Sequence, residues 1–380
     1  MSFCGSLIRR VLEAGFVFLL ITFLPGLPPN MEFTAYSVTE PRELEGVLAV
    51  NNKLNGAERI GEGELIGPEG FAVANKTLYF GLKGGEIKKL SPNGKISTVI
   101  NLGRPCGGYW DEQNCGRPLG MQFDKHGMLY VVDSFYGIYK VNVATGKSMQ
   151  IISTEEPIEG KIAKTANSVA VSNDGSAVYW TVSSCDVGLH NGVLSFFGDG
   201  SGRVFKFDPI KKTNTLLMDK LHFANGIVLS SKEDFLVVAE THRARLLRLK
   251  TFPSPHEVLA PYPVVRRFLA RLLSLIEMPF ELIHRNFPNE ITGKITFWVN
   301  NFEMIMPLFP KALIVLEVNE AGEVIDTLQS TDNNVCSVSD IVFVDQTYYL
   351  GSPFNEYLGR VKTRIPIHVK VSTDAPPTKS

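Results

Sequence analysis

Oxygen-bearing side chains recur at corresponding places along this chain and are the first candidates for a site. Glu69, Asn167 and Asn225 each stand in a short polar or proline opening that precedes an apolar segment. Such openings recur roughly every 50 to 60 residues, a period typical of arrays such as the β-propeller. They are Pro68-Glu69-Gly70-Phe71, Arg117-Pro118-Leu119-Gly120, Asn167-Ser168-Val169, Asn225-Gly226-Ile227, Pro288-Asn289-Glu290-Ile291 and Ser337-Val338-Ser339-Asp340-Ile341. Because the innermost strands of a propeller converge on one axis, these three side chains could meet at one point. Asparagine also favours turns without any ligand.

Familiar catalytic and phosphate-binding motifs do not occur in the sequence. It has no Gly-x-Ser-x-Gly nucleophile elbow and no His-Glu-x-x-His zinc motif. Gly146-Lys147-Ser148 lacks the upstream glycine of a phosphate-binding loop. Of the seven histidines, His222 and His242 flank the fourth opening and could face a central channel, although a surface role is commoner.

The segments after the openings have the pattern of four short antiparallel strands each. In the second block we expect strands over 119–123, 128–133, 137–143 and 148–153, separated by polar turns. The third block repeats this pattern, with an insert from Cys185 to Gly200 long enough to cross one face. The last block supplies only three strands, so we expect residues near 58–66 to add the fourth strand and remove a free edge. The sequence therefore predicts an all-β protein, a six-bladed β-propeller.

One region departs from the repeat. After the strand expected at Leu246–Leu249 the chain enters an amphipathic helical segment, and helical spacing continues to Met306. The fifth blade is therefore predicted to be incomplete, with strands only at 312–318 and 323–328. The apolar stripe of the helix has two interpretations, a lid that packs on the propeller or a helix on a membrane surface. This stripe contains Val264, Val265, Phe268, Leu269, Leu272 and Ile276.

The N-terminus has the pattern of a secretory signal or a signal anchor. Arg9-Arg10 precede an apolar stretch from Ala14 to Leu24 and then a proline cluster. We expect an uncleaved anchor, a single-pass type II arrangement with the body lumenal or extracellular, because the arginine pair stays cytoplasmic. A cleaved signal peptide is the alternative. The expected organisation is a flank and anchor at 1–30, a linker at 31–57, the propeller at 58–365 with a helical insertion at 261–306, and a tail at 366–380.

Composition and cysteine usage agree with a folded protein in an oxidising compartment. Hydrophobic residues make up 44% of the chain, and the formal net charge is -1, which gives no basic face for nucleic acid. Cys106 and Cys115 bracket a short loop and could form a disulfide, with two free thiols as the alternative. Asn75-Lys76-Thr77 is an N-glycosylation sequon in an expected turn, so we predict glycosylation at Asn75.

Several of these segments resemble the strictosidine synthase-like six-bladed propellers, in particular their membrane-anchored animal branch. The similarity extends from about Gly61 to about Lys362 and includes the arginine-rich helix. The segments that show it are Gly67–Phe71, Cys115–Gly120, Tyr130–Val141, Phe223–Gly226, Val238–Thr241 and Tyr349–Pro353.

The resemblance implies a calcium ion on the axis. Related propellers hold Ca²⁺ with a glutamate, two asparagines and an aspartate, and Glu69, Asn167 and Asn225 match the first three. The segment that carries the aspartate is absent between about Lys250 and Pro261. Weak binding is therefore expected unless Glu290 or another acid substitutes, because ligand charge sets affinity.

The resemblance implies an arylesterase-like hydrolase acting on a small ester and assisted by calcium, with no general base that we can name. The catalytic glutamate of strictosidine synthases corresponds to Ser339, and the histidine bases of the related paraoxonases correspond to Leu119 and Ser134. Neither mechanism is therefore expected here. The alternative is a non-catalytic, membrane-tethered propeller that binds a ligand or a protein partner.

Overall fold

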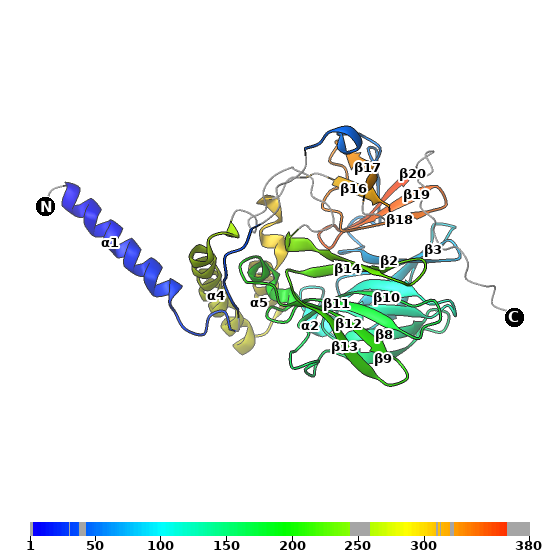
Figure 1. The fold of residues 1–380 in the computed structure, drawn as a ribbon, viewed down its shortest axis with the longest axis horizontal. Helices are drawn as coiled ribbons and strands as arrows, with labels where there is room; N and C mark the ends of the chain where they lie inside the picture. The colour runs from blue at the N-terminus through cyan, green and yellow to red at the C-terminus, as the bar shows by residue number, and fades with distance from the viewer. Residues whose placement is uncertain are drawn as a thin grey trace.

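The computed structural model of the 380-residue chain describes residues 3–29, 31–37, 43–243, 259–308, 311, 313–319 and 323–362. Figure 1 shows a body of β-sheets, a layer of helices against one side of it, and the N-terminal helix α1 (Phe3–Thr22) projecting away. The expected strand at Leu246–Leu249, most of the segment between Lys250 and Pro261, and the tail at 366–380 lie outside the described residues.

The described strands form six antiparallel sheets, four of four strands and two of two strands. Consecutive sheets are formed by consecutive stretches of chain, and the first strands of neighbouring sheets pack side by side in the series β18, β2, β6, β10 and β14. This is the arrangement of a β-propeller. The first three sheets contain β2–β5 (Glu69–Ala74, Thr77–Gly81, Glu86–Leu90, Ile96–Asn101), β6–β9 (Pro118–Phe123, Leu129–Asp133, Gly137–Asn142, Lys147–Ser153) and β10–β13 (Thr165–Val171, Val178–Ser184, Gly202–Asp208, Thr213–Leu221).

The two-stranded sheets flank the region where the sequence pattern fails. They contain β14–β15 (Ala224–Leu229, Leu236–Glu240) and β16–β17 (Leu313–Val318, Val324–Ser330). The fifth block thus has the two strands that the sequence predicts and no further strand within the described residues.

The last sheet is completed from the other end of the described body. It contains β18–β20 (Asp340–Val344, Thr347–Gly351, Leu358–Lys362), and β1 (Glu58–Ile60) pairs with β20 through Glu58 opposite Arg360 and Ile60 opposite Leu358. The predicted fourth strand from the region 58–66 is confirmed. This pairing covers the edge of β20, which would otherwise be open to another chain.

The hairpin turns follow from short polar side chains that bond to their own backbone. Asp124 accepts hydrogen bonds from the backbone N–H groups of His126 and Met128, both at 2.9 Å, and so closes the turn between β6 and β7. Asn75 and Lys76 join β2 to β3 with φ values of 49° and 59°, which suit a two-residue hairpin. Asn75 is exposed in this turn, as expected, and its glycosylation stays a prediction.

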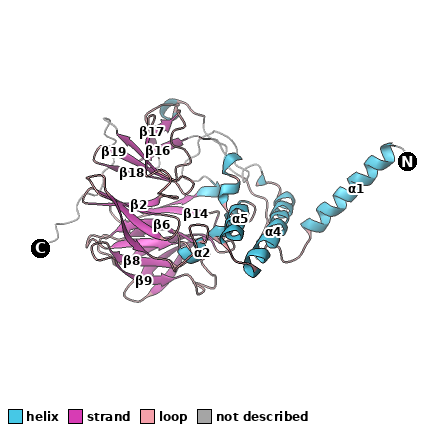
Figure 2. Cartoon of the chain, turned by 180° about the vertical axis from the view of Figure 1, so that it is seen from behind, coloured by secondary structure: helices cyan, strands magenta, loops and turns pink. Residues whose placement is uncertain are grey.

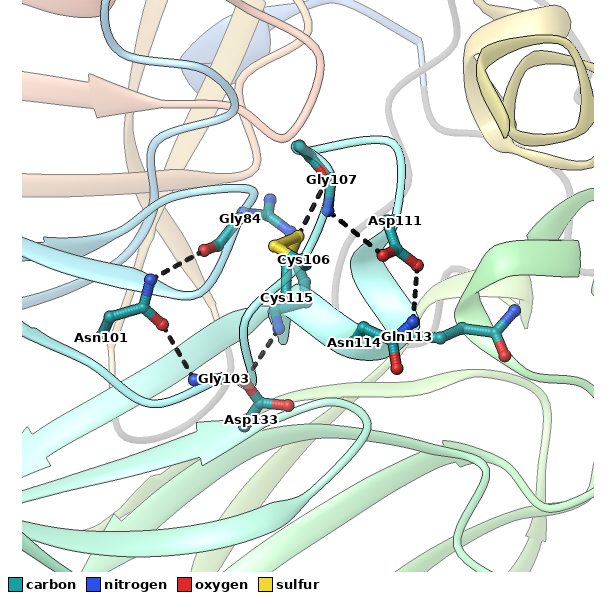
Figure 3. Close-up of a disulfide and its surroundings, with 12 residues drawn as sticks. Gly84, Asn101, Gly103, Cys106, Gly107, Asp111, Gln113, Asn114, Cys115 and Asp133 are labelled. Carbon is teal, nitrogen blue, oxygen red and sulfur yellow. Dashed lines mark hydrogen bonds between the residues drawn. A yellow bond between two sulfur atoms is a disulfide. The ribbon is translucent and has the colours of Figure 1, made fainter. Parts of the chain in front are cut away.

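The predicted disulfide between Cys106 and Cys115 is present, with a Cα–Cα distance of 5.2 Å (Figure 3). It closes a loop that ends in the short helix α2 (Glu112–Cys115). This loop packs against the sheets so closely that a Cβ atom on Gly103 would lie 1.5 Å from the carbonyl oxygen of Cys115. Cys185 and Cys336 are free thiols.

The insertion is helical, as predicted, and contains α4 (Pro263–Asn286), α5 (Glu290–Asn300), η4 (Phe302–Met304) and η5 (Met306–Leu308). Asn289 caps α5 through hydrogen bonds from the N–H groups of Ile291 and Thr292, both at 3.0 Å. The pattern Pro288-Asn289-Glu290-Ile291 is therefore a helix start rather than a fifth opening.

The orientation of α4 contradicts the lid interpretation. Three members of the predicted apolar stripe, Val264, Val265 and Ile276, are 48%, 36% and 47% exposed, and the other three are only partly buried. The buried positions are instead Arg266, Ala270, Ser274 and Glu277. The helix presents its small and polar side to the body because the buried arginine finds acceptors there.

Among the described residues, α1 included, no helix combines the length and the apolar character needed to cross a bilayer.

The disulfide should stabilise the protein by restricting the conformations open to the unfolded chain. We expect the free energy of unfolding of the double variant Cys106→Ser, Cys115→Ser to be about 2–3 kcal/mol lower than that of the wild type, which is the value for closing a loop of this length. Denaturant titration of the full chain measures the difference, and Cys336→Ser, which removes a free thiol, is the matched control. Equal midpoints for the double variant and the wild type would contradict a stabilising bond.

Glu277 should make the stability of the fold depend on pH. Its side chain is 3% exposed, and burial, reinforced by the nearby Glu281, raises its pKa to about 8. Since this folded-state pKa lies above the unfolded value, the stabilisation is complete below about pH 4.5 and is lost as the pH rises through 8. Glu277→Gln should therefore gain stability relative to the wild type between pH 5 and pH 9. The upper limit is about 5 kcal/mol, since one pKa unit equals roughly 1.4 kcal/mol. Melting curves at both pH values measure this gain, with the exposed and distant Glu156→Gln as control. A stability difference that stays constant between the two pH values would refute the prediction.

Candidate functional site

Four of the openings that recur in the sequence are β-bulges in the structure. The first strands of four successive sheets each shift register at the opening. A bulge bends a strand locally and redirects its side chains, and bulges are common beside active sites. The shifts lie between Glu69 and Ala72 in β2, Pro118 and Met121 in β6, Ala166 and Val169 in β10, and Ala224 and Ile227 in β14.

Glycines allow neighbouring bulges to approach one another. Gly70 has φ +69°, and a Cβ atom there would lie 1.7 Å from the carbonyl oxygen of Leu119 on the next inner strand. A Cβ atom on Gly120 would lie 2.6 Å from the Cα atom of Ser168. Larger residues would push the inner strands apart, so the glycines bring the bulged side chains towards one another.

All three sequence-predicted site residues line one cavity of about 420 Å³. Glu69 comes from β2, Asn167 from β10 and Asn225 from β14, so three sheets contribute one residue each. Leu119 and Ser339 line the same cavity. Convergence of the inner strands thus brings together residues more than 150 positions apart in the sequence.

Much of the cavity wall is apolar and comes from the two insertions. The insert after β11 folds into η2 (Leu189–Phe196), and the segment after α5 contributes η4 and η5. Their lining side chains are Leu189, Phe196, Phe302, Ile305 and Met306. The cavity therefore has a polar part made by bulges and an apolar part made by loops and helices.

The Glu69 carboxylate is held from two sides. The Arg117 guanidinium donates through Nη2 to Glu69 Oε2 at 3.0 Å, and the Ser339 hydroxyl donates to Oε1 at 2.8 Å. Arg117 also donates through Nη1 to the carbonyl oxygen of Gly67 at 2.9 Å, and its side chain is 1% exposed. Ser339 thus positions the Glu69 carboxylate.

The Asn225 carboxamide has a defined hydrogen bond. Its Nδ2 atom donates to the Thr241 hydroxyl at 3.1 Å, which directs the Oδ1 atom away from Thr241. The backbone carbonyl of Asn225 accepts a hydrogen bond from Thr181 Oγ1 at 2.7 Å, and Thr181 Oγ1 accepts one from the N–H of Ser168 at 3.0 Å. These bonds connect the third and fourth inner strands beside the site.

Charged residues that the sequence did not single out also line the cavity. The Lys83 and Glu112 side chains are 7% and 2% exposed, and Lys83 forms an ion pair with Glu303 of η4. Burial lowers the pKa of Lys83 to about 8 and raises the pKa of the Glu112 carboxyl. Arg117 Nε lies 3.9 Å from Glu112 Oε1. The only sequence signal for this cluster was a charged Arg117 inside an otherwise apolar opening.

His222 and His242 flank the fourth opening, and His242 faces the cavity. His242 lines it and stacks between Phe196 and Phe223, with ring centroids 4.6 Å from each. His222 lies beside it, where its Nε2 atom accepts a hydrogen bond from the N–H of Gly200 at 3.3 Å.

Acidic residues are sparse around the predicted calcium ligands. Within the described residues, no group of three or more His, Cys, Asp or Glu side chains is placed to hold a metal ion. Glu290 is exposed on α5 and pairs with Lys294 at 2.7 Å, and it does not line the cavity with the three predicted ligands. Any cation at this position would rely on Glu69 and on carboxamide oxygens.

Comparison with known proteins shows which family the chain is similar to. The family model described as strictosidine synthase matches residues 167–251, and the one described as strictosidine synthase-like, N-terminal, matches residues 46–90. A gluconolactonase from Xanthomonas campestris covers 87% of this chain and 95% of its own, with 12% identity and a TM-score of 0.47.

Curated relatives match most of the chain. The adipocyte plasma membrane-associated protein Hemomucin of Drosophila melanogaster is 35% identical over 401 residues, covering 93% of this chain and 69% of the relative. The adipocyte plasma membrane-associated protein of Rattus norvegicus is 31% identical, covering 86% of this chain and 91% of the relative. The human protein of the same name is 31% identical over 342 residues. This chain therefore belongs to the adipocyte plasma membrane-associated protein family of strictosidine synthase-like proteins.

Proposed function

We propose that this protein is an arylesterase-like hydrolase that binds a small ester in the central cavity with the help of calcium. The observation that carries the proposal is the convergence of Glu69, Asn167 and Asn225, from three sheets, on a cavity with an apolar wall. A largely apolar pocket with a few convergent polar groups is the usual form of a small-molecule site. We further propose six blades with an incomplete fifth one, and a type II anchor at the N-terminus with the body lumenal or extracellular.

The donor set suits calcium chemically but provides little charge. Calcium prefers hard oxygen ligands, which one carboxylate and two carboxamides supply. The Arg117 guanidinium, 3.0 Å from Glu69 Oε2, offsets the one negative charge and would lower cation affinity. The residues therefore fit a weak site that water molecules complete. A bound calcium ion would polarise the ester carbonyl and stabilise the oxyanion that develops on it.

The other residues would position and enclose the substrate. The apolar side chains of η2, η4 and η5 would bind the organic part of an ester and exclude water from it. Arg117 and Ser339 keep the Glu69 carboxylate in one orientation, and Thr241 does the same for the Asn225 amide. Preorganised polar groups of this kind need no rearrangement at the moment of reaction.

A specific observation favours the second candidate, a non-catalytic propeller that binds a ligand or a protein partner. Both oxygens of Glu69 already accept hydrogen bonds within the protein, from Arg117 and Ser339. A carboxylate in this state can serve purely to neutralise a buried arginine. The two functions make opposite predictions for calcium and for ester turnover.

Calcium should raise the melting temperature of a hydrolase that holds the ion. For a site with dissociation constants of about 10⁻⁴–10⁻³ M, roughly 10 mM calcium should stabilise by about 1–3 kcal/mol, which corresponds to several degrees. The measurement is a thermal melt of the full chain with calcium and with a chelator, and magnesium serves as the control ion. Equal melting temperatures with calcium and with the chelator would favour the non-catalytic propeller.

Glu69→Gln should remove ester hydrolysis together with the response to calcium. We expect turnover of phenyl acetate to fall by about 10²-fold or more, since the charged ligand is lost. Because the variant removes the carboxylate that is hydrogen-bonded to buried Arg117, the melting temperature must be measured as well. Ser339→Ala, which removes only a positioning hydrogen bond, should lose less activity, and exposed Glu290→Gln should lose none. Unchanged turnover in a folded Glu69→Gln protein would exclude the proposed hydrolase function.

A further inference from the structure

The amphipathic helix α4 turns its small and polar side towards the body of the protein and its apolar side away from it. Its buried positions, spaced by four, four and three residues, include a guanidinium and a carboxyl group rather than large apolar side chains. Arg266 donates to the carbonyl oxygens of Phe197, at 2.7 Å, and Thr34, and lies 3.3 Å from Asp199 Oδ1. Helices of soluble proteins normally turn their apolar stripe inward, so the outer face of α4 needs another explanation.

Helix α4, the residue before it, the turn after it and α5 all expose large apolar side chains. Eleven of them are between 36% and 71% exposed. Exposed apolar surface concentrated on one pair of packed helices marks an interaction site more often than scattered single residues do. We call this set the outer helical face: Tyr262, Val264, Val265, Ile276, Met278, Leu282, Ile283, Phe287, Ile291, Ile295 and Trp298.

The outer helical face adjoins another exposed apolar helix. The ring of Phe18 on α1 packs 4.6 Å from that of Phe268 on α4, and Arg271 Nε donates to the carbonyl oxygen of Leu27 at 2.6 Å. Helix α1 leaves the body beside α4, and no sheet lies against it in Figure 1 or Figure 2. Its exposed side chains include Leu12, Phe16 and Leu20, at 68%, 68% and 55%. Two apolar surfaces therefore lie next to each other.

The composition of this surface favours a lipid bilayer over a protein partner. Trp298 and Tyr262, both 57% exposed, are the amphipathic aromatic types that concentrate at membrane–water interfaces. Arg267, Arg271 and Arg285 outnumber Glu281 among the charged side chains of α4 that are not buried, which suits anionic headgroups. Long arginine side chains can also extend from an apolar surface to the headgroup layer.

We propose that the outer helical face lies in the interfacial layer of an anionic phospholipid bilayer, independently of any activity in the cavity. Because η4 and η5 follow α5 directly and line the cavity, the bilayer would then lie on the side of the protein that bears the apolar cavity wall. The proposal concerns α4 and α5 themselves and does not depend on how α1 meets the membrane.

Fluorescence of Trp298 in the full chain tests the contact directly. The chain has three tryptophans: Trp180 is fully buried, Trp110 is partly buried beside α5, and Trp298 is exposed on α5. The test therefore starts from the Trp110→Phe variant. We expect vesicles that contain phosphatidylserine and a phosphatidylcholine brominated near the headgroup to quench the emission of this variant. Adding Trp298→Phe should remove most of that quenching. Equal quenching with and without Trp298→Phe, or none in either protein, would overturn the proposal.

Vesicle flotation separates the outer helical face from α1. The background is the full chain with Phe16→Asp and Leu20→Asp, which makes the apolar side of α1 polar. In this background the triple variant Leu282→Ser, Phe287→Ser, Ile291→Ser should bind anionic vesicles at least tenfold more weakly, since binding scales with buried apolar area. The matched triple variant Met149→Ser, Ile210→Ser, Ile325→Ser replaces exposed apolar residues on two sheets and in a hairpin turn, and should bind like the background.

Two flotation results would contradict the proposal. One is a background protein that does not bind anionic vesicles, and the other is equal weakening by both triple variants. All six residues are exposed, so loss of the fold does not explain a difference, and melting temperatures check this. Binding to anionic vesicles that falls as salt rises would support the role of the arginines, because salt screens exposed charges.

Discussion

A buried guanidinium is the constraint around which the centre of this protein is organised. Arg117 is almost inaccessible to water, and a charge in that position must be compensated by carboxylates and by backbone acceptors. Glu69 from β2 and Gly67, two residues before it, provide this directly, and Glu112 from the disulfide-closed loop lies close by. One side chain thereby connects two neighbouring sheets and the loop that lies over them. The geometry of Glu69, and hence of the cavity, follows from this requirement.

The same requirement explains why the loops near the cavity are so firmly attached. The disulfide and the close approach of Gly103 to Cys115 fix α2, and α2 carries Glu112 to the cavity wall. On the other side, Lys83 pairs with Glu303 and so connects the first sheet to the segment that follows α5. Charged contacts thus join the sheets to the insertions, while the apolar side chains of the insertions line the cavity. A second buried arginine, Arg266, attaches α4 to the insert after β11 in a similar way, and its inward position leaves the apolar side of the helix facing outward.

Much of the fold could be predicted because its signals are local. Short apolar segments separated by turn residues predicted the strands of the second and third sheets to within a few residues, and the missing fourth strand of the last block predicted the contribution of β1. The spacing of Cys106 and Cys115 suggested the disulfide for the same reason. The orientation of α4 could not be predicted, because helical periodicity shows that a helix has two faces and does not show which one meets the body. The orientation of α4 follows from Arg266, which donates hydrogen bonds to the carbonyl oxygens of Thr34 and Phe197, residues distant from it in sequence.

The sequence by itself determined that openings recur, that they carry Glu69, Asn167 and Asn225, and that the fifth member of the series is interrupted. These are properties of residue type and spacing, which local backbone preferences translate into strands, turns and bulges. Only the tertiary structure decided that the three side chains share a cavity with Arg117, Ser339, Lys83 and Glu112. Packing of one inner strand against the next determines which residues become neighbours, and burial then determines their partners. The charge balance at the axis, on which both metal binding and catalysis depend, is therefore a property of the assembled sheets.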